Sequence, residues 1–334
     1  MKFYKILFIN SMIFGTLLSI SSFSWFSMWM GLEINLLSII PLLNSSKNIY
    51  PSEAAIKYFI TQAMASSIIM LAIILYLNIL EFIPQDSKIY LNIMMNSGLM
   101  IKLGAAPFHF WFPEVMEGLN WNFCLIMLTW QKIAPMILIM NNIYFNMFTY
   151  TVIITCSLIS GIQGINQISL RKILTYSSIN HIGWMLASML YSHSIWFLYF
   201  LIYSIISINI ILIFNSMNIF YLKQLINTMN YNKLLKMLFS LNFLSLGGLP
   251  PFLGFLPKWL TINYLINNNL YILSTILIIS TLVTLYFYLR ITFNSLMMYS
   301  SENLNHNFKM NNFVIIFNLI SISGLIMCTF ILNF

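Results

Sequence analysis

Hydrophobic runs of about 20 residues recur along the whole of this 334-residue chain, and they restrict its fold more than any other feature. Only 7% of the residues are charged, whereas a soluble domain carries about a quarter. So few charged side chains cannot cover the surface of a water-soluble fold. A transmembrane β-barrel would need alternating segments of about ten residues, which these runs do not show. The sequence therefore predicts an all-α polytopic membrane protein.

About eleven transmembrane helices are predicted. They cover residues 3–21, 24–43, 54–80, 90–117, 121–141, 145–164, 171–190, 194–220, 234–262, 270–298 and 312–333. The N-terminus resembles a signal peptide, but its apolar run is long and no small-residue cleavage pattern follows, so we interpret it as the first helix. No connection is long enough for a separate domain, so residues 1–334 are predicted to form a single membrane domain.

The basic residues indicate how the helices are oriented. With the N-terminus inside, 11 of the 15 Lys and Arg residues lie in inside segments and only Lys88 lies in an outside loop. This bias predicts an N-terminus in the matrix or cytoplasm and a C-terminus on the opposite side. The net charge of +8 is therefore explained by the loops. Because no basic stretch is interleaved with aromatic residues, no nucleic-acid partner is expected.

One motif occurs twice, 144 residues apart. The stretches "GAAPFHFWFPEV" (104–115) and "GLPPFLGFLPKW" (248–259) both read G-x-x-P-F, then a short apolar run, a proline and a charged residue. They fall in the fourth and ninth predicted helices, so the two copies cross the membrane in opposite directions. Inverted repeats with broken helices are typical of transporters. We predict five-helix repeats over 1–142 and 143–298, with an additional C-terminal helix within 299–334.

Each copy is predicted to break its helix. The residues responsible are Gly104 and Pro107 in the first copy and Gly248, Pro250 and Pro251 in the second. Proline lacks an N–H and displaces the carbonyl four residues earlier, here on Leu103, Leu246 and Gly247. Freed carbonyls inside a membrane need partners. A packing kink is the simpler explanation, but the duplication and the nearby lysines favour a hydrated or protein-lined interior.

Four charged residues fall well within predicted membrane spans: Glu33, Lys102, Lys132 and Lys258. Each costs about 2.5–3.5 kcal/mol at the bilayer centre on the insertion scale. Snorkelling to the interface would explain Lys258, but it is a poor explanation for Glu33 and Lys132, which lie near mid-span. These four residues are the candidate functional site.

The types of these residues favour proton transfer. Burial disfavours the charged form of a lysine and a nearby carboxylate favours it, so a lysine beside a movable Glu33 is a proton switch. Lys102 or Lys132 is the expected partner. His109 and His181 are candidate further members, although a lone membrane histidine is more often a hydrogen-bonded packing residue. Three lysines argue against a metal or sodium site.

No cofactor or metal site is expected on this chain. The three cysteines, Cys124, Cys156 and Cys328, are scattered and form no C-x-x-C, so we interpret them as buried inert thiols. The histidines lack the spacing needed to hold a haem between two helices. There is no G-x-G-x-x-G after a strand and no P-loop. A polar patch is expected around His181, with Ser177, Ser178 and Asn180 beside it.

Several long stretches resemble one family. These are "GLEINLLSIIPLL", "EAAIKYFITQA", "IKLGAAPFHFWFPEV", "TWQKIAPM", "LRKILTYSSINHIGWM", "LSLGGLPPFLGFLPKW" and "YFYLR", in order across residues 31–290. They resemble the chain 2 family of mitochondrial NADH:ubiquinone oxidoreductase, respiratory complex I, in an insect-like or other invertebrate version. The resemblance implies an antiporter-like membrane-arm subunit that moves protons while electron transfer occurs elsewhere in the complex.

The resemblance also implies a location and partners. The expected location is the mitochondrial inner membrane, with the N-terminus in the matrix and the C-terminus in the intermembrane space. The expected partners are other membrane-arm subunits, including neighbouring antiporter-like chains, and lipids such as cardiolipin. Flavin, iron–sulfur clusters and quinone are expected on other subunits. Compared with bacterial relatives, the chain resembles a shortened form that lacks three N-terminal helices.

The resemblance gives each charged residue a role. Glu33 matches the glutamate that pairs with the first lysine, Lys102 matches that lysine, Lys132 the central connecting lysine and Lys258 the lysine after the second break. Two alternatives remain open: a stand-alone cation/proton antiporter, and a structural subunit that uses its charges only for assembly. The structural alternative predicts that neutralising Lys132 lowers the abundance of the complex rather than its turnover.

Overall fold

The computed structural model describes residues 3–44, 49–79, 86–142, 147–229 and 233–297, together with Asn318 and Gly324. Within these ranges the regular elements are α-helices, and seven spans are long and apolar enough to cross a membrane, judged by length and composition. The prediction of an all-α polytopic membrane protein is confirmed at this level. The count of eleven helices stays a prediction, and the helix expected at 312–333 lies outside the described residues.

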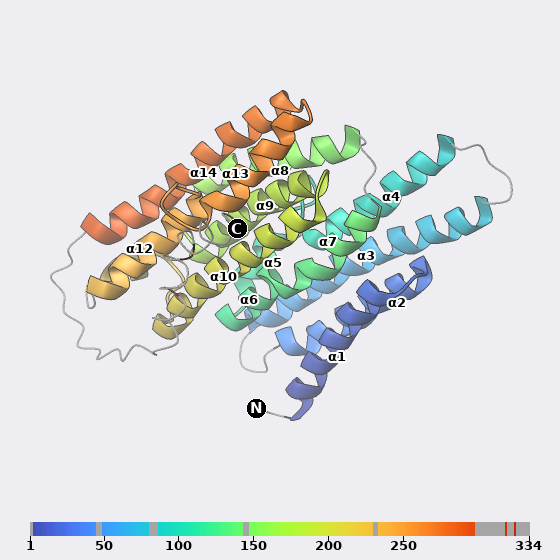
Figure 1. Cartoon of the computed structure of the whole chain (residues 1–334). Coiled ribbons are helices and arrows are strands. Elements are labelled where there is room, and N and C mark those ends of the chain that lie inside the picture. Colours follow the sequence, from blue (N-terminus) through green and yellow to red (C-terminus); the bar gives the residue numbers. More distant parts are fainter. Residues whose placement is uncertain are drawn as a thin grey trace. The chain divides into compact units, whose positions relative to one another are not determined.

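The chain divides into two compact units, with the boundary between Val152 and Ile153. Figure 1 labels most of the helices. The first unit holds α1 (Phe3–Ser21), α2 (Trp25–Leu43), α3 (Ile49–Ile79), α4 (Asp86–Leu103), α5 (Trp111–Gly118), α6 (Trp121–Leu128) and α7 (Trp130–Asn141). The boundary falls inside α8 (Met147–Ile165). The second unit holds α9 (Leu170–Met189), α10 (His193–Met217), α11 (Leu222–Met229), α12 (Lys233–Gly247), α13 (Phe255–Asn267) and α14 (Tyr271–Met297).

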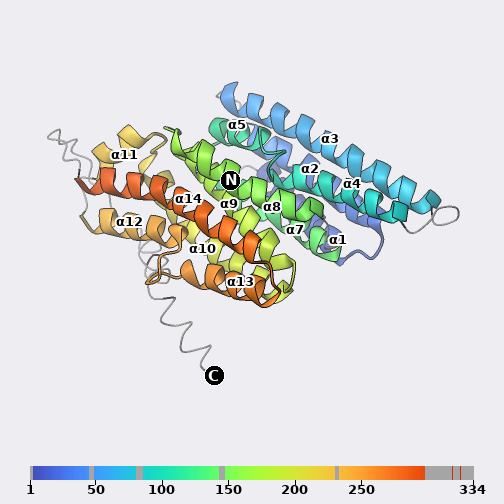
Figure 2. The same ribbon diagram turned by 90° about the horizontal axis from the view of Figure 1, so that it is seen from above.

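Small residues allow the first two helices to approach closely. A Cβ added at Gly31 would lie 2.6 Å from the Ser19 nitrogen, and one at Gly15 would lie 2.9 Å from the Asn35 nitrogen. Glycine and serine at such contacts are typical of helix packing in membranes. Elsewhere in this unit, α3 lies beside α4 and also packs against α5, and α4 packs against α7. In the second unit, α14 lies beside α12 (Figure 2).

A glycine ends the helix at each repeated motif. The helix predicted over 90–117 is two helices, α4 and α5, and the one predicted over 234–262 is α12 and α13. Gly104 has φ +71° and Gly248 has φ +77°, a left-handed conformation that glycine adopts without steric cost. Each helix therefore ends before its prolines, which corrects the expectation that the proline rings cause the break. Pro107 and Pro250 follow within the intervening turns.

The two helix ends share one hydrogen-bond pattern. The glycine N–H donates to a carbonyl three residues earlier, and the next N–H donates to a carbonyl five residues earlier. The bonds are Gly104 to Ile101 at 3.1 Å and Ala105 to Met100 at 3.0 Å, then Gly248 to Ser245 at 3.0 Å and Leu249 to Leu244 at 3.4 Å. This is the Schellman arrangement, which satisfies carbonyls at the end of a helix. The motif repeated in the sequence is thus repeated in local backbone geometry.

Two further differences from the sequence prediction have local causes. The helix predicted over 121–141 is interrupted at Thr129, between α6 and α7. Thr129 has φ −115° and ψ −70°, outside regular helical geometry. Pro135 lies inside α7 and lacks the N–H that would bond the carbonyl of Gln131.

The second difference is α11, which lies in a segment predicted to be a loop. Its start is stabilised by the side chain of Gln224, whose Oε1 accepts hydrogen bonds from the N–H groups of Phe220 at 2.8 Å and Tyr221 at 3.2 Å. These two donors have no partner within the helix, so the glutamine acts as an N-terminal cap.

Candidate functional site

Lys102 lies beside a small polar cavity in the first unit. The lysine belongs to the last turn of α4 and is 8% exposed. The polar side chains that line this cavity are Asn35 of α2, Tyr58 and Gln62 of α3, Lys102 of α4 and Gln131 of α7. Four helices therefore surround one buried ammonium group with hydrogen-bonding side chains.

Glu33 acts on Lys102 through its charge rather than through a contact. Within the described residues the two side chains form no ion pair within 4.0 Å, yet the Glu33 carboxylate interacts electrostatically with the Lys102 ammonium. The Oε1 atom of Glu33 is buried and has no hydrogen-bond partner among the same residues. A buried carboxylate oxygen without a donor is energetically costly, so Glu33 is poised to respond to nearby positive charge.

Lys132 is buried at the start of α7, close to α5. It is 2% exposed, and its Nζ lies 5.8 Å from the centre of the Phe112 ring. This distance is within the range of a cation–π contact. Because Lys132 is buried, its ammonium group does not reach the surface of its unit. This agrees with the sequence, which made snorkelling a poor explanation for Lys132.

Lys258 is turned toward the break that precedes it. Its side chain is 7% exposed, and its Nζ donates hydrogen bonds to the carbonyls of Gly247 at 2.9 Å and Leu246 at 3.3 Å. These are the two carbonyls that the sequence predicted to need partners, and the snorkelling explanation for Lys258 is wrong within this unit. Residues 153–297 contain no Asp or Glu, so this part of the chain offers the ammonium carbonyls rather than a carboxylate.

The first break satisfies its carbonyls with different side chains. Trp111, the first residue of α5, donates its Nε1–H to the carbonyl of Ile101 at 3.1 Å. The Gln62 amide donates to the carbonyl of Lys102 at 3.4 Å. The carbonyls at this helix end are therefore bonded by neutral donors, whereas those at the second break are bonded by a lysine.

The two candidate histidines occupy different settings. His181 is 4% exposed, and its Nδ1 lies 2.9 Å from the Tyr199 hydroxyl. Both side chains line a second small cavity. His109 is 1% exposed, and its Nδ1 donates to the carbonyl of Pro107 at 3.3 Å, within the first break. His109 therefore bonds the backbone of the turn, whereas His181 faces a cavity.

The polar patch expected around His181 is confirmed. The three polar side chains predicted beside it, Ser177, Ser178 and Asn180, are all buried. The amide of Asn180 donates to the Thr284 hydroxyl of α14 at 3.3 Å. A helix as polar as α9 is thus enclosed by its unit, and the Asn180 amide nitrogen finds its partner on another helix.

The two cavities have corresponding linings at the spacing of the repeated motif. Three pairs of lining residues are 144 apart: Tyr58 and Ile202, Gln62 and Ile206, and Lys102 and Leu246. The second cavity lacks the lysine but carries His181 on α9. Both cavities therefore present one basic side chain, supplied by different helices.

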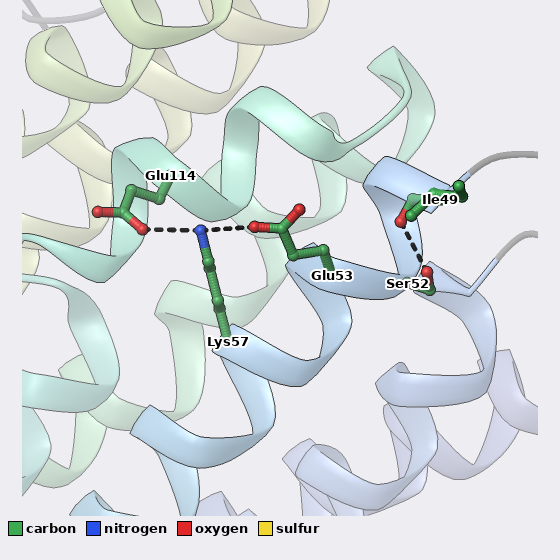
Figure 3. Close-up of polar contacts among 5 residues, drawn as sticks. All are labelled: Ile49, Ser52, Glu53, Lys57 and Glu114. Atoms are coloured by element: carbon green, nitrogen blue, oxygen red, sulfur yellow. Dashed lines mark hydrogen bonds and ion pairs between the residues drawn. The ribbon is translucent and has the colours of Figure 1, made fainter.

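A cluster of exposed charges ties α5 to α3 (Figure 3). The Nζ of Lys57 lies 3.0 Å from Glu53 Oε1 and 3.0 Å from Glu114 Oε2. The side chains are 42–58% exposed, so each ion pair contributes about 0–1 kcal/mol. Glu114 stands 144 residues before Lys258, at the charged position of the motif, but it faces outward where Lys258 faces inward.

Several lining residues were missed by sequence reasoning. Asn35, Tyr58, Gln62, Gln131 and Tyr199 are uncharged, so they did not stand out from a membrane span as a charge does. Asn35 and Gln131 could have been found as amides within two residues of Glu33 and Lys132. Cys124 and Cys156 are buried as predicted, and Cys328 lies outside the described residues. Among the described residues, no three His, Cys, Asp or Glu side chains could together hold a metal ion.

A set of apolar helices, two of them broken at glycine, with lysines buried between them, defines an antiporter-type membrane protein. In agreement, residues 22–284 match the family described as NADH:quinone oxidoreductase/Mrp antiporter, transmembrane. NADH-ubiquinone oxidoreductase chain 2 of Anopheles gambiae is 50% identical and that of Locusta migratoria 46%, covering 97% of this chain and 97% and 96% of the relatives. This chain belongs to the NADH-ubiquinone oxidoreductase chain 2 family.

A solved structure supports the fold. A chain of respiratory complex I from Thermus thermophilus superposes with a TM-score of 0.84 over 96% of this chain and 78% of that chain. The two share 21% sequence identity, so the likeness concerns the fold alone.

Substitution of Gly248 is expected to disturb the second break. Alanine would have to adopt φ +77°, which costs about 1–2 kcal/mol, and its Cβ would lie 2.8 Å from Lys258 Cδ. Gly248→Ala should therefore lower the temperature at which the assembled protein is lost on native gels. Gly247→Ala is the matched control, because its nearest neighbour would lie at 3.6 Å and its φ is not positive. Equal losses in the two variants would contradict this account.

Proposed function

We propose that this chain is a proton-translocating membrane-arm subunit of NADH:ubiquinone oxidoreductase, and that Glu33, Lys102, Lys132 and Lys258 carry the protons. The observation that supports this role most directly is the burial of three lysines, each 2–8% exposed, in a chain of this family. A buried ammonium group is costly, and its environment decides whether it keeps its proton. Such groups suit a relay whose members gain and lose protons in turn.

The proposed mechanism begins at the first lysine. The Glu33 charge holds Lys102 protonated, and a change transmitted from neighbouring subunits weakens this interaction. The proton then leaves Lys102 for Lys132 and later Lys258, with water between the members. His181 is a candidate intermediate because it lines a cavity, and its neighbour Leu246 carries a carbonyl bonded to Lys258. His109, bonded to the turn, supports the break instead.

We further propose that the chain is an inverted repeat of residues 1–142 and 143–298. Corresponding helices support this. α1 and α8 begin 144 residues apart, as do α3 and α10, and α5 and α13, while α2 and α9 begin 145 apart. The matching glycine conformations and hydrogen bonds at the two breaks add independent support. An inverted repeat gives each half its own broken helix beside a cavity, the arrangement that places ion sites near the membrane centre.

The proposed location is the mitochondrial inner membrane, with the N-terminus in the matrix and the C-terminus in the intermembrane space. The distribution of Lys and Arg among the loops supports this orientation. The proposed partners are neighbouring antiporter-like and other membrane-arm subunits, with lipids such as cardiolipin. This chain carries no redox centre in the proposal, and flavin, iron–sulfur clusters and quinone belong to other subunits.

The test of this function uses native mitochondrial membranes, solubilised gently and separated on a native gel. Mass spectrometry locates this chain, and the same lane is stained for NADH dehydrogenase activity. We expect the chain to co-migrate with a large active band. Migration apart from that activity, together with independent ion exchange in liposomes, would contradict the proposal and support a stand-alone cation/proton antiporter.

A further inference from the structure

Three uncharged side chains form a hydrogen-bonded chain across the first unit. The Nε2 of Gln131 on α7 donates to Oδ1 of Asn35 on α2 at 2.8 Å. The Tyr58 hydroxyl on α3 donates to Oε1 of Gln131 at 3.4 Å. Gln131 is the central member, because both bonds involve its amide. The network connects three helices that are far apart in sequence and makes the position of this amide depend on all of them.

The same three side chains line the cavity that contains Lys102. The Lys102 ammonium has three hydrogen-bond donors and lies in a buried setting, so it needs acceptors at close range. A polar cavity of this kind can hold water that supplies them. Gln131 lines this cavity, so its amide is within reach of such water. The oxygen and the nitrogen of an amide have opposite effects on a nearby positive charge.

Gln131 also immediately precedes Lys132 in α7. Its amide therefore connects the cavity of the first lysine with the helical turn that carries the second. The titratable groups around this amide are Lys102 of α4 and Tyr58 of α3, with Glu33 of α2 acting on Lys102 through its charge and Lys132 adjacent in α7. No carboxylate lines the cavity itself.

We propose that Gln131 is a positioning residue for proton transfer: held by Asn35 and Tyr58, its amide orients the solvent beside Lys102 and thereby sets how readily that lysine releases its proton toward Lys132. This inference rests on the proposed function. With Nε2 bonded to Asn35, the remaining lone pair of Oε1 is free to face the cavity and stabilise positive charge there. Rotation of this amide exchanges an acceptor for a donor and favours release of the proton.

The test compares Gln131→Glu and Gln131→Leu in the assembled complex, with proton pumping measured across a range of pH in sealed vesicles. Gln131→Glu keeps the size of the side chain but adds a carboxylate to the cavity. It should hold Lys102 protonated and shift the pH profile of pumping toward alkaline pH by about one unit or more. Gln131→Leu removes both hydrogen bonds and should lower pumping per complex by about tenfold.

Two further variants separate positioning from a structural role. Gln224→Glu adds the same charge on the exposed start of α11 and should leave the profile unchanged. Asn35→Asp preserves the acceptor for Gln131 Nε2 while placing a carboxylate in the cavity, so it should reproduce the alkaline shift even if Gln131→Glu assembles poorly.

The outcomes are distinct. An unchanged pH profile in both Gln131→Glu and Asn35→Asp, with normal assembly of at least one, would overturn the positioning role. The positioning role would also be overturned if Gln131→Leu reduced the amount of complex but left pumping per complex unchanged. If Lys102→Met pumped normally, the proposed function itself would fail, and this distinguishes the two failures.

Discussion

Exchange of Lys102 for methionine is expected to abolish most NADH-driven proton pumping by the assembled complex. Methionine is unbranched and similar in length, so it can fill the space of the buried lysine stem, but it cannot carry a proton. Loss of a proton-transferring group typically lowers the rate by about 10²-fold or more. The measurement is proton uptake into sealed vesicles, divided by the amount of complex on a native gel. Lys223→Met, at an exposed position in α11, is the control and should pump normally.

Two companion variants identify which property of Lys102 matters. Lys102→Arg preserves positive charge but hardly deprotonates, so it should also impair pumping. Glu33→Gln removes the charge that acts on Lys102 and should reduce pumping while the lysine remains. If Lys102→Met and Glu33→Gln both assembled and pumped normally, neither residue would belong to the proton pathway.

The sequence predicted those features that a membrane makes costly. A charge in an apolar span stands out whatever the detailed packing, so Glu33 and the three lysines were found without a structure. The two breaks were also found, because glycine and proline disturb any helix. The predicted cause of the breaks, the proline rings, was only partly correct. Gly104 and Gly248, in the left-handed conformation, end the helices before the prolines are reached.

The remaining details depend on contacts between helices that are distant in sequence. Tyr58 and Gln131 are separated by 73 positions, and nothing in either local stretch indicates that they share a cavity with Lys102. The interruption at Thr129 was missed because the apolar pattern continues through it from α6 into α7. The start of α11 depends on one side chain, Gln224, within a polar segment that resembles a loop.

The lysines differ in what holds them, and this difference suggests a division of roles. Lys102 has a carboxylate acting on it from α2 and neutral polar groups around its cavity. Lys258 has two backbone carbonyls at a helix end, where the partial negative charge of the helix is concentrated. A side chain can move its charge, whereas a helix end is fixed. We therefore propose that control is exerted at Lys102 and that Lys258 serves as a stationary acceptor for the proton.

Replacement of Lys258 should separate proton transfer from structural support. Lys258→Met removes the donor to the Gly247 and Leu246 carbonyls, so it should lower both the heat stability of the assembled complex and its pumping. Lys258→Arg keeps N–H donors for these carbonyls but hardly releases a proton.

Lys258→Arg should therefore preserve more of the heat stability than Lys258→Met, yet pump about tenfold less than wild type. Stability is measured by heating the complex before a native gel, and pumping by proton uptake in vesicles from the same preparation. If Lys258→Arg restored both quantities, the lysine would serve only to cap α12. Loss of pumping with retained stability would instead require a proton to leave this site in each productive cycle.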